Sequence, residues 1–308
     1  MKILVTGSSG FVGRQVIAQL VRQGATVVGS SRVATEIQGI EHVTADLIVP
    51  GAAAALIDRV RPTHLLHLAW NAQPGKFWTA ANNLDWCGAS LELIRSFHAA
   101  GGQRAVLAGS CAEYDWSGNG RLDERISPAN PATLYGVAKD ALRRLVLRDA
   151  EQHGHSVAWG RIFWLYGPGE AAGRLVSDVA AALRDGNEPA VSKGTQMRDF
   201  MHVADAAGAF VAALRGDYQG IFNICSGSAV AVCDVVRSLA EAMGKPEHVR
   251  FGARSAKPDE PPVLYGNVAR LHDDIGFRPI FDLRDGLTNT AQWWCQKATE
   301  DENPPRDA

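Results

Sequence analysis

The chain begins with a short apolar run that leads directly into a glycine-rich turn. The run Lys2–Thr6 is followed by Gly7-Ser-Ser-Gly10-Phe-Val-Gly13 and then by the helical pattern Val12–Gln23. Gly7 suits a tight turn, Gly10 lets the backbone approach a pyrophosphate, and Gly13 allows the helix to pack closely on the strand. The amino end of the helix then stabilises the anion. This order of elements constrains the chain to begin with a βαβ unit that binds a dinucleotide.

The rest of the first half repeats the alternation of short apolar runs with helical segments. This alternation predicts an α/β fold of the Rossmann type, with a doubly wound parallel sheet covered on both faces. After about residue 165 the elements shorten, which predicts a smaller C-terminal mixed α/β lobe. We therefore expect a first domain over 1–165, with the chain returning to it at about 195–225, a lobe over 166–296 and a disordered tail over 297–308. The expected strands are Lys2–Thr6, Thr26–Ser30, His64–Leu68, Ala105–Ala108 and Val157–Ile162, and the expected helices are Val12–Gln23, Leu84–Ala100 and Leu134–His153.

Composition excludes several classes of function. The net charge is −2 and the basic residues are dispersed, so we expect neither a nucleic-acid partner nor an anionic membrane. No apolar stretch is long enough to span a bilayer, and Met1-Lys2 leads straight into the first strand without a signal peptide. The five cysteines form no C-x-x-C pair, which argues against disulfides or a metal site. We expect a cytoplasmic protein with no metal.

The segment Tyr135-Gly-Val-Ala-Lys139 places a phenol and an ammonium four residues apart. Because residues i and i+4 share a helix face, the helix Leu134–His153 brings Lys139 beside Tyr135. A free tyrosine titrates near about 10, and a nearby cation lowers that pKa toward the working pH. Ser110 follows the strand Ala105–Ala108, at a carboxyl end where open α/β sheets bind ligands. We expect Ser110, Tyr135 and Lys139 to be catalytic.

The end of the second expected strand indicates which dinucleotide is used. NAD sites usually carry an acid there, whereas this chain has Ser31 and Arg32. Serine and arginine can bind a 2′-phosphate, so NADP(H) is favoured and NAD(H) is the alternative. In that alternative Arg32 stacks on the adenine or faces solvent. The residues expected at the cofactor are Gly7, Ser9, Gly10, Phe11, Val12, Gly13, Ser31, Arg32, Asp46, Leu47, Leu68, Ala69, Tyr135 and Lys139.

With these residues assembled, the chain resembles the extended short-chain dehydrogenase/reductase family, in its nucleotide-sugar epimerase, dehydratase and reductase branch. The resemblance runs from Lys2 to about Trp294. It implies a Rossmann domain that binds NAD(P), a C-terminal lobe that binds a nucleoside-diphosphate sugar, and a homodimer formed through two helices per subunit. The matching motifs are Gly7-x-x-Gly10-x-x-Gly13, His67-Leu-Ala, Ser110, Tyr135-x-x-x-Lys139, Arg161 through Tyr166-Gly-Pro168, Arg198-Asp-Phe-Met-His-Val-x-Asp205 and Asn223-Ile-x-Ser-Gly227.

The resemblance also implies roles for individual residues. Tyr135 is the acid/base, Lys139 lowers its pKa and binds the nicotinamide ribose, and Ser110 hydrogen-bonds the reacting sugar oxygen. Arg198 matches an arginine that contacts the diphosphate of the sugar nucleotide. Lys257 lies in a segment similar to one that supplies a second such contact. The alternatives are a salt bridge from Arg198 to Asp199 or Asp205, and a solvent-exposed Lys257.

The segment after the serine separates the reactions of this family. Dehydratases carry Thr-Asp-Glu, a hydrophobic residue and a tyrosine; aligned on Tyr114, this chain has Ser110, Cys111 and Ala112 in the first three places. Enzymes that make GDP-fucose need a cysteine two residues before that tyrosine and a histidine after the later Gly-Pro, where this chain has Ala112 and Gly169. Cys111 is one position off and on a strand-like segment points to the opposite side. Both dehydration and carbanion epimerisation therefore lack their acid/base groups.

Hydride chemistry that needs only serine, tyrosine and lysine remains. We expect reduction by NADPH of a keto group, at C4, of a nucleoside-diphosphate 4-keto-6-deoxy sugar. The alternative is an NAD-dependent C4 epimerase, and a non-catalytic NADP sensor is disfavoured because the catalytic residues are present. Trp70, Trp116 and Trp164 depart from the family pattern and either shape an apolar sugar pocket or pack in the core. The residues expected at the substrate are Trp70, Cys111, Trp164, Arg198 and Lys257.

Overall fold

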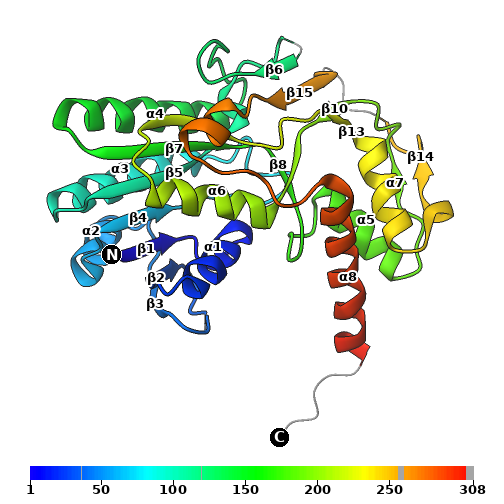
Figure 1. Ribbon diagram of the computed structural model, residues 1–308, viewed down its shortest axis with the longest axis horizontal. Helices are drawn as coiled ribbons and strands as arrows, with labels where there is room; N and C mark the ends of the chain where they lie inside the picture. The colour runs from blue at the N-terminus through cyan, green and yellow to red at the C-terminus, as the bar shows by residue number, and fades with distance from the viewer. Residues whose placement is uncertain (36, 119, 256–259, 303–308) are drawn as a thin grey trace, which may run out of the picture.

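A parallel β-sheet forms the centre of the molecule. The computed structural model describes residues 1–35, 37–118, 120–255 and 260–302. Within these residues the central sheet has seven strands in the order β12-β7-β5-β4-β1-β2-β3, and every neighbouring pair is parallel (Figure 1). The predicted doubly wound Rossmann-type sheet is confirmed. The strands are β1 Lys2–Thr6, β2 Thr26–Ser31, β3 Glu41–Thr44, β4 His64–His67, β5 Arg104–Ser110, β7 Ser156–Ile162 and β12 Gly220–Ile224.

Two helical layers cover the two faces of this sheet and bury separate apolar cores. One core lies beneath α1 and α6, and the other beneath α2, α3 and α4. Both faces of the strands are therefore covered, which explains why the strands read as continuous apolar runs rather than as alternating ones. The covering helices are α1 Phe11–Arg22, α2 Ala52–Val60, α3 Asn83–Ala99, α4 Leu134–His153 and α6 Val203–Arg215.

The remaining elements pack beside the sheet, around a third apolar core under α5, α7 and α8 (Figure 1). Small sheets connect them in the orders β13-β10-β15-β6, β11-β8 and β14-β9. We propose that those of them that follow residue 166 form the expected lobe over residues 166–296. They are β6 Gly120–Leu122, β8 Trp164–Tyr166, α5 Leu175–Arg184, β9 Ala190–Val191, β10 Met197–Arg198, β11 Phe200–His202, β13 Val230–Ala231, α7 Val232–Ala242, β14 Arg250–Phe251, β15 Val263–Gly266 and α8 Leu283–Glu302, with short helical turns at Cys111–Glu113, Pro246–His248 and Arg270–Asp274.

Several elements differ from the expectation. Strand β3 and helix α2 were not predicted, because β3 is four residues long and α2 opens on an alanine run with no side-chain cap. After the first domain the chain comes back through α6, and β12 then forms the sheet edge beside β7. Helix α8 continues to Glu302, past Lys297, where we expected the tail to begin. The rest of that tail lies outside the described residues.

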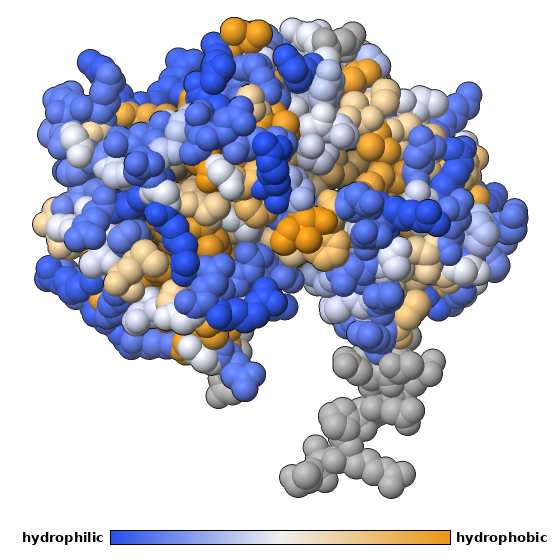
Figure 2. All heavy atoms as spheres, in the orientation of Figure 1, coloured by the Kyte–Doolittle hydropathy of each residue, from blue (hydrophilic) through white to orange (hydrophobic). Residues whose placement is uncertain are grey.

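Much of the surface is hydrophilic in the view of Figure 2, with apolar residues scattered over both halves of the molecule. Among the described residues, the helices are too short or too polar to cross a bilayer.

The turn after β1 has no room for a side chain at two of its glycines. Gly7 has φ +72°, and a Cβ there would lie 2.8 Å from the Ala69 nitrogen. A Cβ on Gly13 would overlap the Gly7 carbonyl oxygen, since the first turn of α1 packs directly on the loop. The glycine spacing is thus a packing requirement of this strand–turn–helix unit.

Replacing Gly13 by alanine should destabilise the fold. We expect a loss of about 1–3 kcal/mol of unfolding free energy, because the added methyl group meets backbone that cannot move aside. Denaturant unfolding followed by circular dichroism measures it. Gly88→Ala is the matched control: Gly88 lies within α3 with open space around its Cα, so alanine should be neutral or stabilise by about 0.5–1 kcal/mol. Equal stability of the two variants would contradict this account of the turn.

Candidate active site

The carboxyl ends of the central strands bring the predicted site residues to one edge of the sheet. The glycine loop follows β1, Ser31 ends β2, Leu68 follows β4 and Ser110 ends β5. Because all these strands are parallel and adjacent, their ends form one continuous crevice edge of the kind that binds ligands in doubly wound folds. Tyr135 joins them from the first turn of α4.

The glycine loop fits a dinucleotide pyrophosphate. Helix α1 begins at Phe11 behind Gly10, which has extended backbone and offers no side-chain cap. The first backbone N–H groups of α1 thus lack a capping side chain and are directed toward the loop, as an anion site requires. Ser9, Phe11 and Val12 are all partly exposed around it. The residues present therefore suit the phosphate-binding role expected of them.

The adenosine end of the site is formed by the ends of β2 and β3. Ser31 Oγ donates to the Val33 carbonyl oxygen at 2.9 Å and lies 2.9 Å from His42 Nε2. Arg32 is exposed and has no ion pair within the described ranges. Asp46 follows β3, and Leu47 packs its side chain into the core, so only its backbone lies at this edge.

A buried hydrogen-bond chain fixes the centre of the crevice. Thr6 Oγ1 lies 2.7 Å from His67 Nδ1, and His67 Nε2 lies 2.8 Å from Ser90 Oγ. Thr6 Oγ1 also accepts the backbone N–H of Ala69, at 3.4 Å. Burial, with a smaller contribution from the charge of Lys139, lowers the pKa of His67 to about 3. His67 is therefore a neutral structural link between β1, β4 and α3.

Ser110 and Tyr135 are brought into direct contact. The Ser110 hydroxyl is close enough to favour the phenolate form of Tyr135 and so to lower its pKa. The approach depends on Gly136: a Cβ there would overlap the carbonyl oxygen of Ala112, in the turn that follows Ser110. The glycine after the tyrosine thus lets α4 pack against the serine turn. Thr133 caps the helix just before this point, accepting the Gly136 N–H at 3.1 Å.

Lys139 does not act on Tyr135 as expected. Its Nζ donates to the carbonyl oxygen of Ala108 at 2.8 Å and lies 3.8 Å from the ring centroid of Trp70. Burial raises the pKa of Tyr135, and the hydrogen bond to Ser110 offsets this only in part. The predicted lowering of that pKa is wrong for this structure, because the cost of desolvating the phenolate is the largest effect. Burial also lowers the pKa of Lys139 to about 7.

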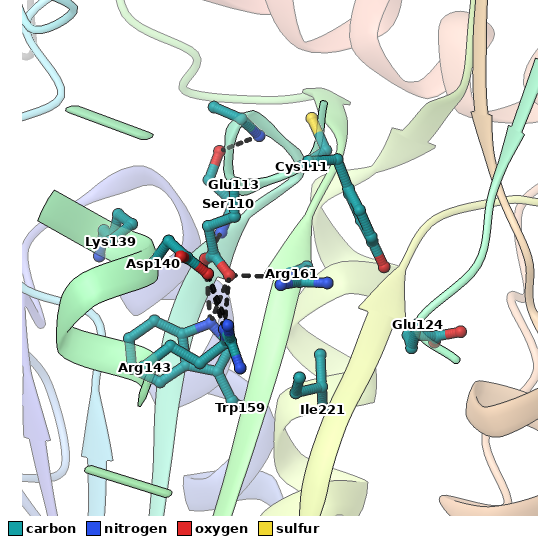
Figure 3. Close-up of polar contacts among 12 residues, drawn as sticks. Ser110, Cys111, Glu113, Glu124, Lys139, Asp140, Arg143, Trp159, Arg161 and Ile221 are labelled. Atoms are coloured by element: carbon teal, nitrogen blue, oxygen red, sulfur yellow. Dashed lines mark hydrogen bonds and ion pairs between the residues drawn. The ribbon is translucent and has the colours of Figure 1, made fainter. Parts of the chain in front are cut away.

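A buried carboxylate holds the serine turn in place. Glu113 Oε1 accepts the backbone N–H of Ser110 at 2.8 Å and the indole N–H of Trp159 at 2.9 Å. Arg161 Nε donates to the other oxygen at 2.7 Å, and Arg143 Nε lies 3.7 Å from it. Figure 3 shows the three side chains converging on this carboxylate. Glu113 is fully buried, so its charge is stable only because these donors surround it.

A row of aromatic rings leads away from the catalytic tyrosine. Trp78 lies edge-on to Tyr135 with ring centroids 5.8 Å apart, and Trp116 lies 6.2 Å from Trp78. Trp164 follows at 5.8 Å from Trp116, and the guanidinium carbon of Arg198 lies 5.3 Å from the Trp164 ring. The three tryptophans are partly exposed. They connect the residue expected at the reacting carbon with the residue expected at the diphosphate.

Two predicted substrate residues have other surroundings. Trp70 donates to Asn83 Oδ1 at 2.9 Å and lies against Lys139 and Tyr135, so it belongs to the catalytic cluster rather than to the row of tryptophans. Cys111 is buried in an apolar cluster, where burial raises the pKa of its thiol. Our placement of Cys111 at the substrate does not fit this burial.

Arg198 has an ionic partner other than those considered from the sequence. Its Nη2 donates to Glu260 Oε1 at 2.8 Å. Asp199 instead accepts the backbone N–H groups of Ser226, Gly227 and Gly266, while Asp205 accepts two backbone N–H groups before α8. The two aspartates therefore hold backbone segments in place by accepting their N–H groups, and neither pairs with Arg198. Lys257 lies outside the described residues.

The family assignment follows from comparison with known proteins. The sequence model of the NAD dependent epimerase/dehydratase family matches residues 3–225. The chain belongs to this family. Its nicotinamide-dinucleotide cofactor fits the glycine loop described above.

Relatives within the family catalyse more than one reaction. The UDP-glucose 4-epimerase of Azospirillum brasilense is 28% identical, over 95% of this chain and 91% of its own. The dTDP-4-dehydro-6-deoxy-D-allose reductase of Streptomyces bikiniensis is 27% identical, over 95% of each chain. A crystal structure of Thermus thermophilus UDP-glucose 4-epimerase with NAD has a TM-score of 0.85 and 23% identity, covering 96% of this chain and 99% of that one. This chain is thus an enzyme of the NAD dependent epimerase/dehydratase family.

Two features of the site were hard to predict from the sequence. Glu113 occupies the position at which the family pattern has a hydrophobic residue. That difference was the one feature of the sequence that could have pointed to its role. Trp78 lies in a loop without a motif, so only the folded chain brings it beside Tyr135.

Replacing Glu113 by glutamine should destabilise the protein and displace Ser110. Removing one partner of a buried ion pair costs about 3–5 kcal/mol, because Arg161 would keep an uncompensated charge. Chemical denaturation measures this loss. Glu151→Gln is the matched control, since the Arg148–Glu151 pair is more than two-thirds exposed and should contribute less than about 1 kcal/mol. If Glu113→Gln were as stable as Glu151→Gln, the carboxylate would not hold the serine turn.

Proposed function

We propose that this protein reduces the C4 keto group of a nucleoside-diphosphate 4-keto-6-deoxy sugar with NADPH, and that Tyr135 donates the proton. The observation that carries the proposal is the approach of Ser110 to Tyr135, with Lys139 one turn further along the same helix. The neighbouring groups of the serine turn are poor proton carriers: Ala112 has no ionisable group, and Cys111 has a buried thiol whose pKa is raised. Glu113 is occupied by its own donors. One proton donor suits one hydride transfer at one carbon.

The direction of the Tyr135 pKa supports the role of an acid. A phenol with a raised pKa is protonated at neutral pH, and that form donates a proton to a developing alkoxide. The bound cofactor supplies the hydride to the carbonyl carbon. Ser110 hydrogen-bonds the carbonyl oxygen and positions it against Tyr135. Lys139 is held by the Ala108 carbonyl oxygen, one helical turn after Tyr135.

The row of tryptophans supports a substrate with an apolar face. Trp78, Trp116 and Trp164 offer ring surface and few hydrogen-bonding groups, which suits the methyl group and C–H faces of a 6-deoxy sugar. At the far end Arg198 supplies a cation for the diphosphate. Glu260 pairs with that cation, so diphosphate binding requires Glu260 to move or to share it.

Arg32 supports NADPH over NADH. It is exposed beside the end of β2, without an acid at that position, and a guanidinium binds a phosphate through two parallel hydrogen bonds. NAD-dependent C4 epimerisation is the second candidate. It is supported by the names of the epimerase relatives and by the NAD in the Thermus structure. A non-catalytic NADP sensor is a weaker alternative.

We also propose a cytoplasmic homodimer formed through α3 and α4. These two helices pack side by side on one face of the sheet. They leave large apolar side chains outside: Leu84 is 63%, Val137 47% and Leu145 54% exposed. Such exposure on adjacent helices fits a protein interface.

Replacing Tyr135 by phenylalanine should abolish most turnover. We expect kcat with NADPH and a 4-keto-6-deoxy sugar nucleotide to fall about 10²–10⁴-fold, since the proton donor is lost, while the Kd for NADPH stays unchanged. Absorbance loss of NADPH, tested on a panel of such substrates, measures it. Tyr218→Phe is the control, because that hydroxyl donates to the Ile221 carbonyl oxygen away from the site. Near-normal turnover of the Tyr135 variant would show that Tyr135 is not the proton donor.

Replacing Arg32 by alanine should weaken NADPH and spare NADH. Loss of one phosphate contact of about 1.4 kcal/mol raises the KM for NADPH roughly tenfold. Steady-state kinetics with each cofactor measure the change. Arg22→Ala is the control, since Arg22 lies exposed at the far end of α1. A wild-type preference for NADH would overturn the NADPH assignment and favour the epimerase.

A further inference from the structure

A cluster of imidazoles lies at the edge of the sheet opposite the candidate active site. His98 is in the last turn of α3, Asp149 and His153 are in the last turns of α4, and His155 follows α4 before β7. The amino ends of the strands lie on this side. Along α4 Asp149 is roughly 21 Å from Tyr135, for 14 residues at 1.5 Å each.

The donor atoms of three of these residues lie close together. One ligand atom each from His98, Asp149 and His155 lies within 4.8 Å of the others. The imidazole rings of His98 and His155 stack with centroids 3.8 Å apart. All three residues are partly exposed.

His98 has buried ring nitrogens without hydrogen-bond partners. Both of its ring nitrogens are shielded from solvent, and neither has a hydrogen-bond partner in the described part of the chain. Shielded polar nitrogens nearly always have a partner in folded proteins. Both nitrogens of His98 are therefore available as ligand atoms.

We propose that His98, Asp149 and His155 form a binding site for a divalent transition-metal ion of the Zn²⁺ class. Two imidazole nitrogens and one carboxylate oxygen are the donor set that Zn²⁺ takes, with water as the fourth ligand. Tetrahedral Zn²⁺ with bonds of about 2.0–2.1 Å separates its ligands by about 3.4 Å. Because an imidazole binds a metal in its ring plane, one of the two stacked rings must turn out of the stack to close the site.

His153 supports this arrangement from outside. Its Nδ1 lies 3.2 Å from Asp149 Oδ1, which leaves the second carboxylate oxygen free to face the ion and fixes the orientation of the carboxylate. A bound ion would connect the end of α3 to the end of α4. Its effect is therefore on stability, and the distance from Tyr135 leaves the chemical step unchanged. The spacing of the cysteines offered no sign of this site, because histidines and a carboxylate form it.

Calorimetric titration of ZnCl₂ into the full-length, untagged, chelator-treated protein tests the proposal. We expect one equivalent bound per chain, with a Kd in the micromolar range or below, and a rise in Tm on binding. Titration with Co²⁺ should give visible absorption bands of a low-coordinate centre. His98→Ala and His155→Ala should each weaken binding at least tenfold, while kcat stays within twofold. His248→Ala, on an exposed turn, should bind like the wild type.

The absence of one-equivalent binding, or binding unchanged in both His98→Ala and His155→Ala, would overturn the site. Asp149→Asn, at a carboxylate that is 44% exposed, gives the same test if the His98 variant folds poorly. The binding and Tm results do not depend on the proposed reductase activity.

Discussion

The candidate active site depends on one buried carboxylate. Glu113 lies in the turn after β5 and binds donors from β5 itself, from β7 and from α4. Removing one partner of a buried ion pair is costly, so these contacts hold the three elements in their relative positions. Ser110 belongs to the same turn and Tyr135 to the same helix. The contacts of Glu113 therefore set the distance between Ser110 and Tyr135, although Glu113 is not expected to contact the substrate.

Glycines complete this arrangement, because they have no side chain at positions where a Cβ would clash with neighbouring atoms. Gly109 leaves room for the Trp159 indole and the Glu113 carboxylate, and Gly136 lets α4 approach the carbonyl oxygen of Ala112. The same device forms the loop after β1, where Gly13 lies on Gly7. The two halves of the site, for the pyrophosphate and for proton transfer, thus both depend on backbone contacts that a methyl group would prevent.

The sequence predicts the parts of this structure that have local signals. The glycine loop, the limits of β1 and α4, and the doubly wound sheet follow from spacing and alternation. Features that depend on tertiary contacts cannot be predicted from spacing and alternation. The pKa of Tyr135 depends on burial among aromatic rings, and the partner of Arg198 is Glu260, 62 residues away. Spacing brought Lys139 to the right helix face, but its ammonium is directed to a backbone carbonyl on β5 instead of the phenol.

The central claim is a net reduction in which Tyr135 supplies the only proton. It is tested most directly by following deuterium from nicotinamide-labelled NADPH during turnover of a 4-keto-6-deoxy sugar nucleotide, with mass spectrometry of the sugar and measurement of NADP⁺ released. The account predicts one deuterium at C4 and one NADP⁺ for each sugar consumed. Interconversion of two C4 epimers of a hydroxy sugar, with no net cofactor oxidised, would contradict it and establish the epimerase.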